Sequence, residues 1–144
     1  MKMDIFEKRF INQILIEAVK LNNATIKEAV EFKIILEEDI LLSKGDIIVD
    51  LSECDHIDST FMGVLVISMK KMKSKDRDLV LIEPKAEKAR AIFSVTDTYK
   101  VFKIYKSLDD ALNNVKASVE DSQVEDYDNI QELNLAWGVG LSRE

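Results

Sequence analysis

Two short apolar runs, DIIVDL at residues 46–51 and DLVLIE at residues 78–83, most constrain the fold of this chain. Both are apolar at consecutive positions, which is typical of parallel strands buried on both faces of a sheet. Between them lies a run, residues 60–72, whose apolar side chains fill a wide arc at helical spacing. The pattern predicts a β–α–β unit, in which the helix carries the chain back to the start of a second, parallel strand.

Further elements of both kinds flank this unit. Residues 3–8 and 11–20 predict two strands that form a hairpin. Pro84 is expected in the first turn of a helix over residues 85–93. A short strand near residues 101–104 and a helix from Ser107 complete the set. The chain is therefore predicted to be an α/β protein with a four- to five-stranded, mostly parallel sheet, a leading β-hairpin and about four helices.

A helix is also expected from Thr25 to Leu42. Thr25 and Glu28 have the spacing of a capping box, and Gly45 suits a left-handed residue just beyond the helix end. At 100° per residue the apolar side chains of this helix fill one arc, and the charged side chains fill the other. The predicted buried arc comprises Ile26, Ala29, Val30, Phe32, Ile34, Leu36, Ile40 and Leu41; the predicted exposed arc comprises Lys27, Glu28, Glu31, Glu38 and Asp39.

Charge divides the chain into two parts. Residues 118–144 hold seven acidic and one basic side chain, whereas the other 117 residues hold 20 acidic and 19 basic ones. We expect a domain over residues 1–117 and an acidic C-terminal tail over residues 118–144. The tail turns apolar near its end, at Ile130, Leu133, Leu135 and Trp137, so both a disordered tail and a short docking helix are consistent with it.

Composition also limits the partners and the compartment. The net charge of −7 argues against a nucleic-acid partner, because phosphate backbones attract basic surfaces. No apolar stretch reaches the roughly 18 residues that a membrane span needs, and the N-terminal residues do not resemble a signal peptide. The single cysteine, Cys54, cannot form an internal disulfide. We therefore expect a cytoplasmic protein without a membrane partner.

The polar trio Asp58-Ser59-Thr60 stands where the chain enters the helix at residues 60–72. In one interpretation, Asp58 or Ser59 only caps this helix by accepting its free amides. In another, the helix N-terminus is an anion site, where a phosphate on Ser59 would be tolerated while the surface around it changed sign. The helix also has a narrow outer stripe of Thr60, Gly63, Ile67, Lys70 and Lys71, with the isoleucine in its middle, and this stripe is a candidate binding face.

The stretch VDLSECDHIDSTFMGVLVISMKK resembles the signature of STAS-domain anti-sigma factor antagonists, in which a strand and a short loop precede Asp-Ser-Ser/Thr-Gly-x-Gly and a helix. The resemblance covers about residues 3–117 and includes the order of the elements. It implies that an anti-sigma factor, itself a serine protein kinase, binds the unphosphorylated protein and releases it after phosphorylating Ser59. A serine phosphatase would reset the switch. It also implies that this chain catalyses nothing and binds no cofactor.

Two positions depart from the family pattern. Phe61 replaces the first motif glycine, although Gly63 keeps the second, and we expect the Phe61 ring to point inward. Leu21-Asn22 stands where the family often has Leu-Asp after the second strand. Either change could mark lost regulation, so the alternative is a constitutive scaffold that binds a protein or a small anion. The predicted partner-binding residues are Asn22, His56, Asp58, Ser59, Thr60, Gly63, Ile67, Lys70 and Lys71.

Three other patterns are discounted. Asp50 ends a buried strand, as in a response-regulator receiver, but the early strands lack the acidic pair that would hold Mg²⁺. Cys54-x-His56 has no second ligand pair for a zinc site, and His56 is the only histidine available as a catalytic base. The lysines of residues 69–77 are expected to form a solvated helix end, with a basic docking patch as the alternative.

Overall fold

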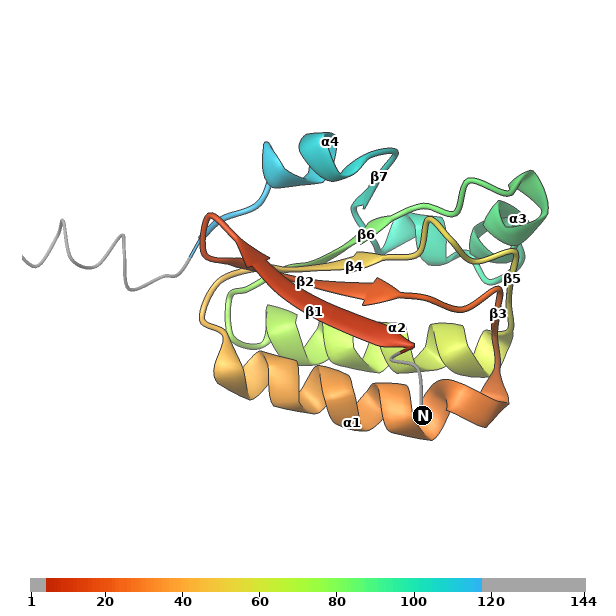
Figure 1. The fold of residues 1–144 in the computed structure, drawn as a ribbon, viewed down its shortest axis with the longest axis horizontal. Coiled ribbons are helices and arrows are strands. Elements are labelled where there is room, and N and C mark those ends of the chain that lie inside the picture. Colours follow the sequence, from red (N-terminus) through yellow and green to blue (C-terminus); the bar gives the residue numbers. More distant parts are fainter. Residues whose placement is uncertain (1–4, 118–144) are drawn as a thin grey trace, which may run out of the picture.

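The computed structural model describes residues 5–117, which form a sheet with helices on both faces (Figure 1). Helices α1 (Ile26–Leu42) and α2 (Ser59–Lys73) lie side by side under one face of the sheet, and the short α4 (Leu108–Leu112) covers the other. Two clusters of buried side chains fill the spaces between these layers. The three-layer arrangement explains why the central strands are apolar at consecutive positions.

The main sheet has five strands in the order β1-β2-β4-β6-β7. Strands β1 (Phe6–Ile11) and β2 (Ile14–Val19) pair antiparallel, and every other pair in this sheet is parallel. Asn12 and Gln13 have φ values of 51° and 70°, which match the two-residue turn that fits a twisted hairpin. Strands β4 (Ile47–Asp50), β6 (Leu79–Ile82) and β7 (Ile104–Tyr105) complete the sheet. The predicted α/β class, mostly parallel sheet and leading hairpin are confirmed.

A second, two-stranded parallel sheet was not predicted from the sequence. It pairs β3 (Asn23–Ala24) with β5 (His56–Ile57). These strands directly precede α1 and α2, so the small sheet holds the starts of both helices next to each other. Two-residue strands are too short to produce the alternating pattern that reveals a strand in a sequence.

Helix α3 (Glu87–Val95) begins later than the sequence predicted. Its N-cap is Ala86, so Pro84 lies outside the helix and not in its first turn. A 3₁₀ turn, η1 (Thr98–Lys100), follows α3. The start of α4 was predicted correctly, because the Ser107 side chain accepts the amide of Asp110 at its first turn.

The prediction for the buried face of α1 is partly wrong. The capping box is present, since the Thr25 amide donates to Glu28 Oε1 at 3.0 Å. Ala29, Phe32, Leu36 and Ile40 are buried as predicted, but Ile26, Val30, Ile34 and Leu41 are 63%, 70%, 52% and 81% exposed. Asp39, predicted on the exposed arc, is completely buried. The contact face of α1 is narrower than its apolar arc and is rotated toward Asp39.

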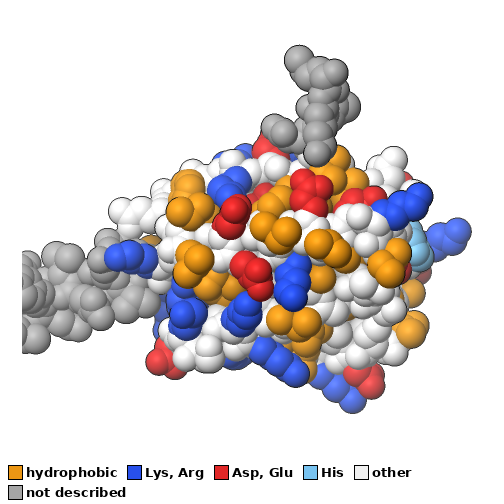
Figure 2. Space-filling model, turned by 90° about the horizontal axis from the view of Figure 1, so that it is seen from below, with side chains coloured by type: hydrophobic (Ala, Val, Ile, Leu, Met, Phe, Trp, Pro, Cys, Tyr) orange, Lys and Arg blue, Asp and Glu red, His pale blue; other side chains and the backbone are white. Residues whose placement is uncertain are grey.

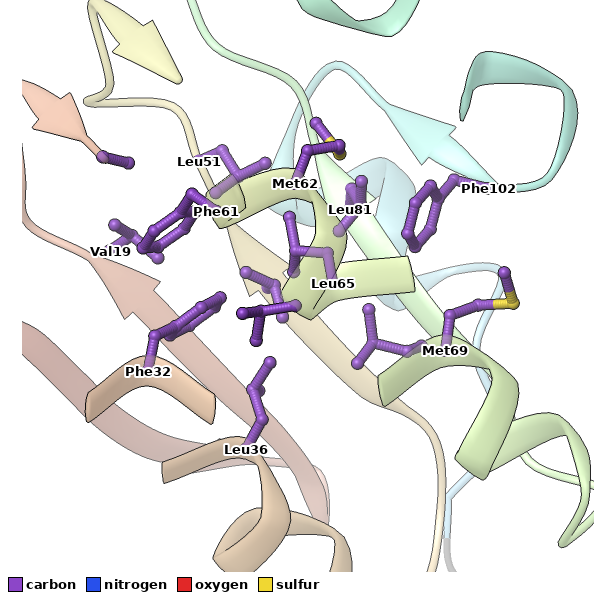
Figure 3. Packing of buried hydrophobic residues seen from close by; sticks show 14 of the residues in the cluster. Val19, Phe32, Leu36, Leu51, Phe61, Met62, Leu65, Met69, Leu81 and Phe102 are labelled. Carbon is purple, nitrogen blue, oxygen red and sulfur yellow. The ribbon is translucent and has the colours of Figure 1, made fainter. Parts of the chain in front are cut away.

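The larger core lies between the sheet and the helices α1 and α2 (Figure 3). Phe61 is completely buried there, and its ring stacks on Phe32 with centroids 4.4 Å apart. Phe32 in turn stacks on Phe6 of β1, at 5.1 Å. The expectation that the Phe61 ring points inward is confirmed, so this departure from the motif adds no bulk to the outer face of α2.

Gly45 does not have the left-handed conformation that the sequence suggested. Ser43 is the C-cap of α1, and Gly45 is required for close approach instead. A Cβ at Gly45 would lie 2.5 Å from the carbonyl carbon of Ala117. The Asp46 carboxylate accepts the amide of Lys116 at 2.9 Å. The last described residues are therefore fixed beside the C-terminal end of α1.

Candidate functional site

A single carboxylate joins the N-termini of α1 and α2. Asp58 is the N-cap of α2, and its Oδ1 accepts the Phe61 amide at 2.8 Å. Its other oxygen, Oδ2, accepts the Ile26 amide at the start of α1, also at 2.8 Å. The negative charge lies at the positive ends of two helix dipoles, where it is stabilised. The cap predicted from the sequence is confirmed, and its second role in holding α1 was not foreseen.

Ser59 and Thr60 follow directly in the first turn of α2, and both are exposed. The first amides of a helix have no carbonyl partner within that helix, so this turn favours an anionic group. Asp58 already supplies one negative charge beside it. The Ser59 hydroxyl is therefore accessible, and an anionic group attached to it would strongly change the charge of this surface.

The outer face of α2 continues from this turn toward the lysines. Gly63 is half-buried, and a Cβ built there would have no neighbour within 4 Å. Ile67 is 49% exposed, and Lys70 is exposed as well. Lys71 Nζ donates to Glu37 Oε2 of α1 at 2.9 Å, which lowers the pKa of Glu37. At 1.5 Å per residue, Lys71 is about 18 Å along the helix from Ser59, so the lysines do not reach the Ser59 hydroxyl.

Asn22 and His56 lie together beside the small sheet. The Asn22 carbonyl accepts the amides of Asp55 and His56 at 2.7 and 3.0 Å. Both Asn22 and His56 have exposed side chains. They border an open cavity of about 480 Å³ lined by Leu21, Asn22, Asn23, Thr25, Lys27, Glu28 and His56. The structure thus brings these two predicted residues together, close to the helix start that Asp58 caps.

The residues discounted in the sequence have local structural roles. Asp50 Oδ1 accepts the Ser52 amide at 2.9 Å in the turn after β4. Cys54 is buried, and burial, together with the charges of nearby carboxylates, raises its pKa to about 12. His56, two residues on, is exposed and does not share that environment. Within residues 5–117, no three His, Cys, Asp or Glu side chains gather as a metal site, and no helix is long and apolar enough to cross a membrane.

The basic segment at the end of α2 divides between two roles. Lys70, Lys71 and Lys73 lie in the last turn of the helix, as expected for cations near its negative end. Arg77 is instead buried and donates to the carbonyl oxygens of Gly45 and Ile40 at 2.8 and 2.9 Å. Burial lowers the Arg77 pKa. This arginine closes the C-terminal end of α1 and is not part of a solvated surface.

Two buried acidic side chains on the inner face of the sheet, with a partly exposed lysine beside them, were not recognised from the sequence. Glu17 of β2 and Asp39 of α1 are 1% and 0% exposed. Lys8 of β1 places its Nζ 2.7 Å from Asp39 Oδ1. Burial, followed by the hydrogen bond and the charge of Asp39, raises the pKa of Glu17 to about 9. The raised pKa favours a neutral Glu17 beside the Asp39 carboxylate, which pairs with Lys8. The signal that could have found them is a glutamate in a strand whose other residues are all apolar.

Comparison with known families identifies the domain that carries the Asp58-Ser59-Thr60 turn. Residues 7–111, most of the described chain, match the STAS domain. The chain belongs to the STAS domain family. A curated relative from Thermotoga maritima, named a candidate anti-sigma factor antagonist, is 32% identical over 80 residues, which are 54% of this chain and 70% of the relative.

Solved structures agree with this family. A crystal structure of a candidate anti-sigma factor antagonist from Thermotoga maritima has a TM-score of 0.64 and 26% identity, covering 75% of this chain and 92% of the other. The antagonist SpoIIAA in its unphosphorylated form has a TM-score of 0.64 and 12% identity, covering 75% and 93%. The similarity of this chain to that structure, and to the Bacillus SpoIIAA in the phosphorylated form, shows a shared fold. STAS anti-sigma factor antagonists are regulatory binding proteins and not enzymes.

Proposed function

We propose that this protein is an anti-sigma factor antagonist that works as a phosphorylation-controlled partner switch. With Ser59 unphosphorylated it binds an anti-sigma factor that is also a serine kinase, and with Ser59 phosphorylated it releases that partner. A serine phosphatase restores the binding form. The observation that carries this proposal is the position of Ser59, exposed at the start of α2 directly after the carboxylate that holds both helices.

The site is suited to a change of surface charge without a change of fold. A phosphate on Ser59 adds a charge of about −1.5 to −2 at neutral pH. The positive end of the α2 dipole tolerates that charge. The phosphate would repel the neighbouring Asp58 carboxylate, but two backbone amides hold this carboxylate in place. The partner would therefore meet a more negative surface on an intact domain.

The proposed contact face extends from Ser59 in two directions. Along α2 it includes Thr60, Gly63, Ile67, Lys70 and Lys71, where the empty space over Gly63 would let a partner approach the helix backbone. Across the small sheet it includes Asn22 and His56, which border the open cavity. The isoleucine supplies apolar area in the middle of a polar rim, an arrangement typical of protein interfaces.

Mass spectrometry of the protein from its native host, with and without phosphatase treatment, tests the modification directly. We expect a phosphate that maps to Ser59. Affinity capture from the same host should recover a kinase with the Ser59→Ala and Thr60→Ala variants, but not with Ser59→Asp.

Two results would contradict the proposal. A tight complex that persists with stoichiometric phosphate on Ser59 would exclude the switch. Absence of phosphate across varied growth and stress conditions would favour a constitutive scaffold.

A further inference from the structure

Helix α1 has a row of aliphatic side chains that are each more than half exposed. We call Ile26, Val30, Ile34 and Leu41 the α1 stripe; they are spaced four, four and seven residues apart and lie within about 80° of one another on the helix. Figure 2 shows this helical side of the molecule, with hydrophobic side chains distributed among lysines and carboxylates. Single exposed aliphatic residues are common, but a row along a whole helix indicates a surface that something covers.

A groove lies at the C-terminal end of this stripe. It has a volume of about 480 Å³ and is bordered by Glu37, Ile40, Leu41, Lys71, Ser74 and Lys75, from both helices and the turn after α2. Leu41 is 81% exposed at its edge. The α2 side of the groove is basic. This end of the helices is opposite to Ser59 (Figure 1), so the groove is separate from the proposed switch.

We propose that residues 130–137 of this chain dock in the groove and along the adjoining part of the α1 stripe. Ile130, Leu133 and Trp137 are spaced three and four residues apart, so that as a helix they would present one apolar face. Tryptophan is enriched among residues that dominate binding energy, because it buries a large area with few rotatable bonds. The segment belongs to residues 118–144, which carry seven acidic side chains and one basic one, complementary to the lysines of the groove.

The point of attachment favours docking within one molecule. Ala117 lies against Gly45, three residues beyond the end of α1, so the remaining chain starts near the end of the helix that borders the groove. Residues 118–129 can span roughly 40 Å when extended, whereas the 17 residues of α1 extend for about 26 Å. A short tether of this kind gives an effective concentration of the order of millimolar. A second copy would need that concentration in solution to compete.

The only tryptophan of the chain makes the proposal directly testable in the full-length protein. We expect Trp137 to have blue-shifted emission and slow quenching by acrylamide at low salt, independent of protein concentration. The Ile34→Ser and Leu41→Ser changes remove two contacts of the stripe. Each should lower the ratio of docked to undocked chains about tenfold, the equivalent of about 1.4 kcal/mol for one buried aliphatic side chain. Higher salt should also increase quenching.

Val95→Ser is the matched control, because Val95 is 80% exposed on α3, away from the groove. It should leave the Trp137 emission unchanged, and circular dichroism should show all variants folded. An exposed Trp137 in the wild-type protein would overturn the proposal. A shielded Trp137 whose emission does not respond to either α1 change would also overturn it. Shielding that occurs only at concentrations where the molecular mass doubles would overturn it too, and would identify a second copy as the occupant.

Discussion

Replacing Glu17 with glutamine is expected to stabilise the fold, and the gain should grow with pH. The pKa of Glu17 is raised from 4.5 to about 9, first by burial and then by Asp39. Between these two values the folded protein holds a proton that the unfolded chain releases. The contribution of Glu17 to stability is therefore greatest below its pKa in the unfolded chain, and it decreases as the pH rises toward its pKa in the folded protein. Glutamine is neutral at every pH and carries an amide donor beside Asp39, so it avoids this loss.

The magnitude follows from the width of the pH window. Each pH unit between the two pKa values costs about 1.4 kcal/mol for one proton. From about pH 5 to pH 8, the advantage of the glutamine variant should therefore increase by up to about 4 kcal/mol. Lys8 acts in the opposite direction on Glu17, and its own pKa is raised, so its titration falls above this window.

Urea unfolding of both proteins at pH 5, 6.5 and 8 provides the measurement. Glu7→Gln is the matched control, because Glu7 lies on the same hairpin with an exposed side chain. Its effect on the free energy of unfolding should be small and nearly independent of pH. A constant difference between wild type and Glu17→Gln over this range would refute a protonated Glu17 in the folded state.

Further predictions concern the shared helix cap and two glycines. Asp58→Ala should lower the free energy of unfolding by about 2 kcal/mol, because two helix amides lose their acceptor and each cap contributes about 1 kcal/mol. Asp58→Asn should lower it less. An Asp58→Ala variant as stable as wild type in urea would contradict the shared cap. Gly45→Ala should destabilise by about 1–3 kcal/mol because its Cβ meets Ala117. Gly63→Ala should instead stabilise by up to about 1 kcal/mol, since the methyl group has free space and favours the helix. Thermal unfolding that ranked the two glycine variants in the opposite order would show this packing to be wrong.

The elements that were predictable are those whose causes lie close together in the sequence. The apolar strands β4 and β6 and the capping box of α1 each depend on a few adjacent residues. The same holds for Asp58, because an N-cap bonds an amide only three residues away. Its second bond, to the Ile26 amide, joins residues 32 positions apart and could not be read from local spacing.

The incorrect predictions concern features that depend on residues far apart in the sequence. The buried face of α1 depends on how the helix lies against α2 and the sheet, which helical periodicity does not specify. Lys8, Glu17 and Asp39 come from three different elements. The sequence could therefore show that Glu17 is unusual among apolar neighbours, but not which polar groups lie beside it. Gly45 had a suitable position for a left-handed cap, but its real constraint is a chain segment more than 70 residues later.

The two edge strands of the main sheet restrict how this protein can bind other proteins. One edge is β1, whose exposed residues include Glu7, Lys8 and Arg9, and the other is β7, which is only two residues long. Charged and short edge strands discourage the addition of a further strand from another chain. Recognition by strand augmentation is therefore disfavoured at both edges. Complexes of this protein should form through side chains on its helices and loops, which can be remodelled by mutation without changing the sheet.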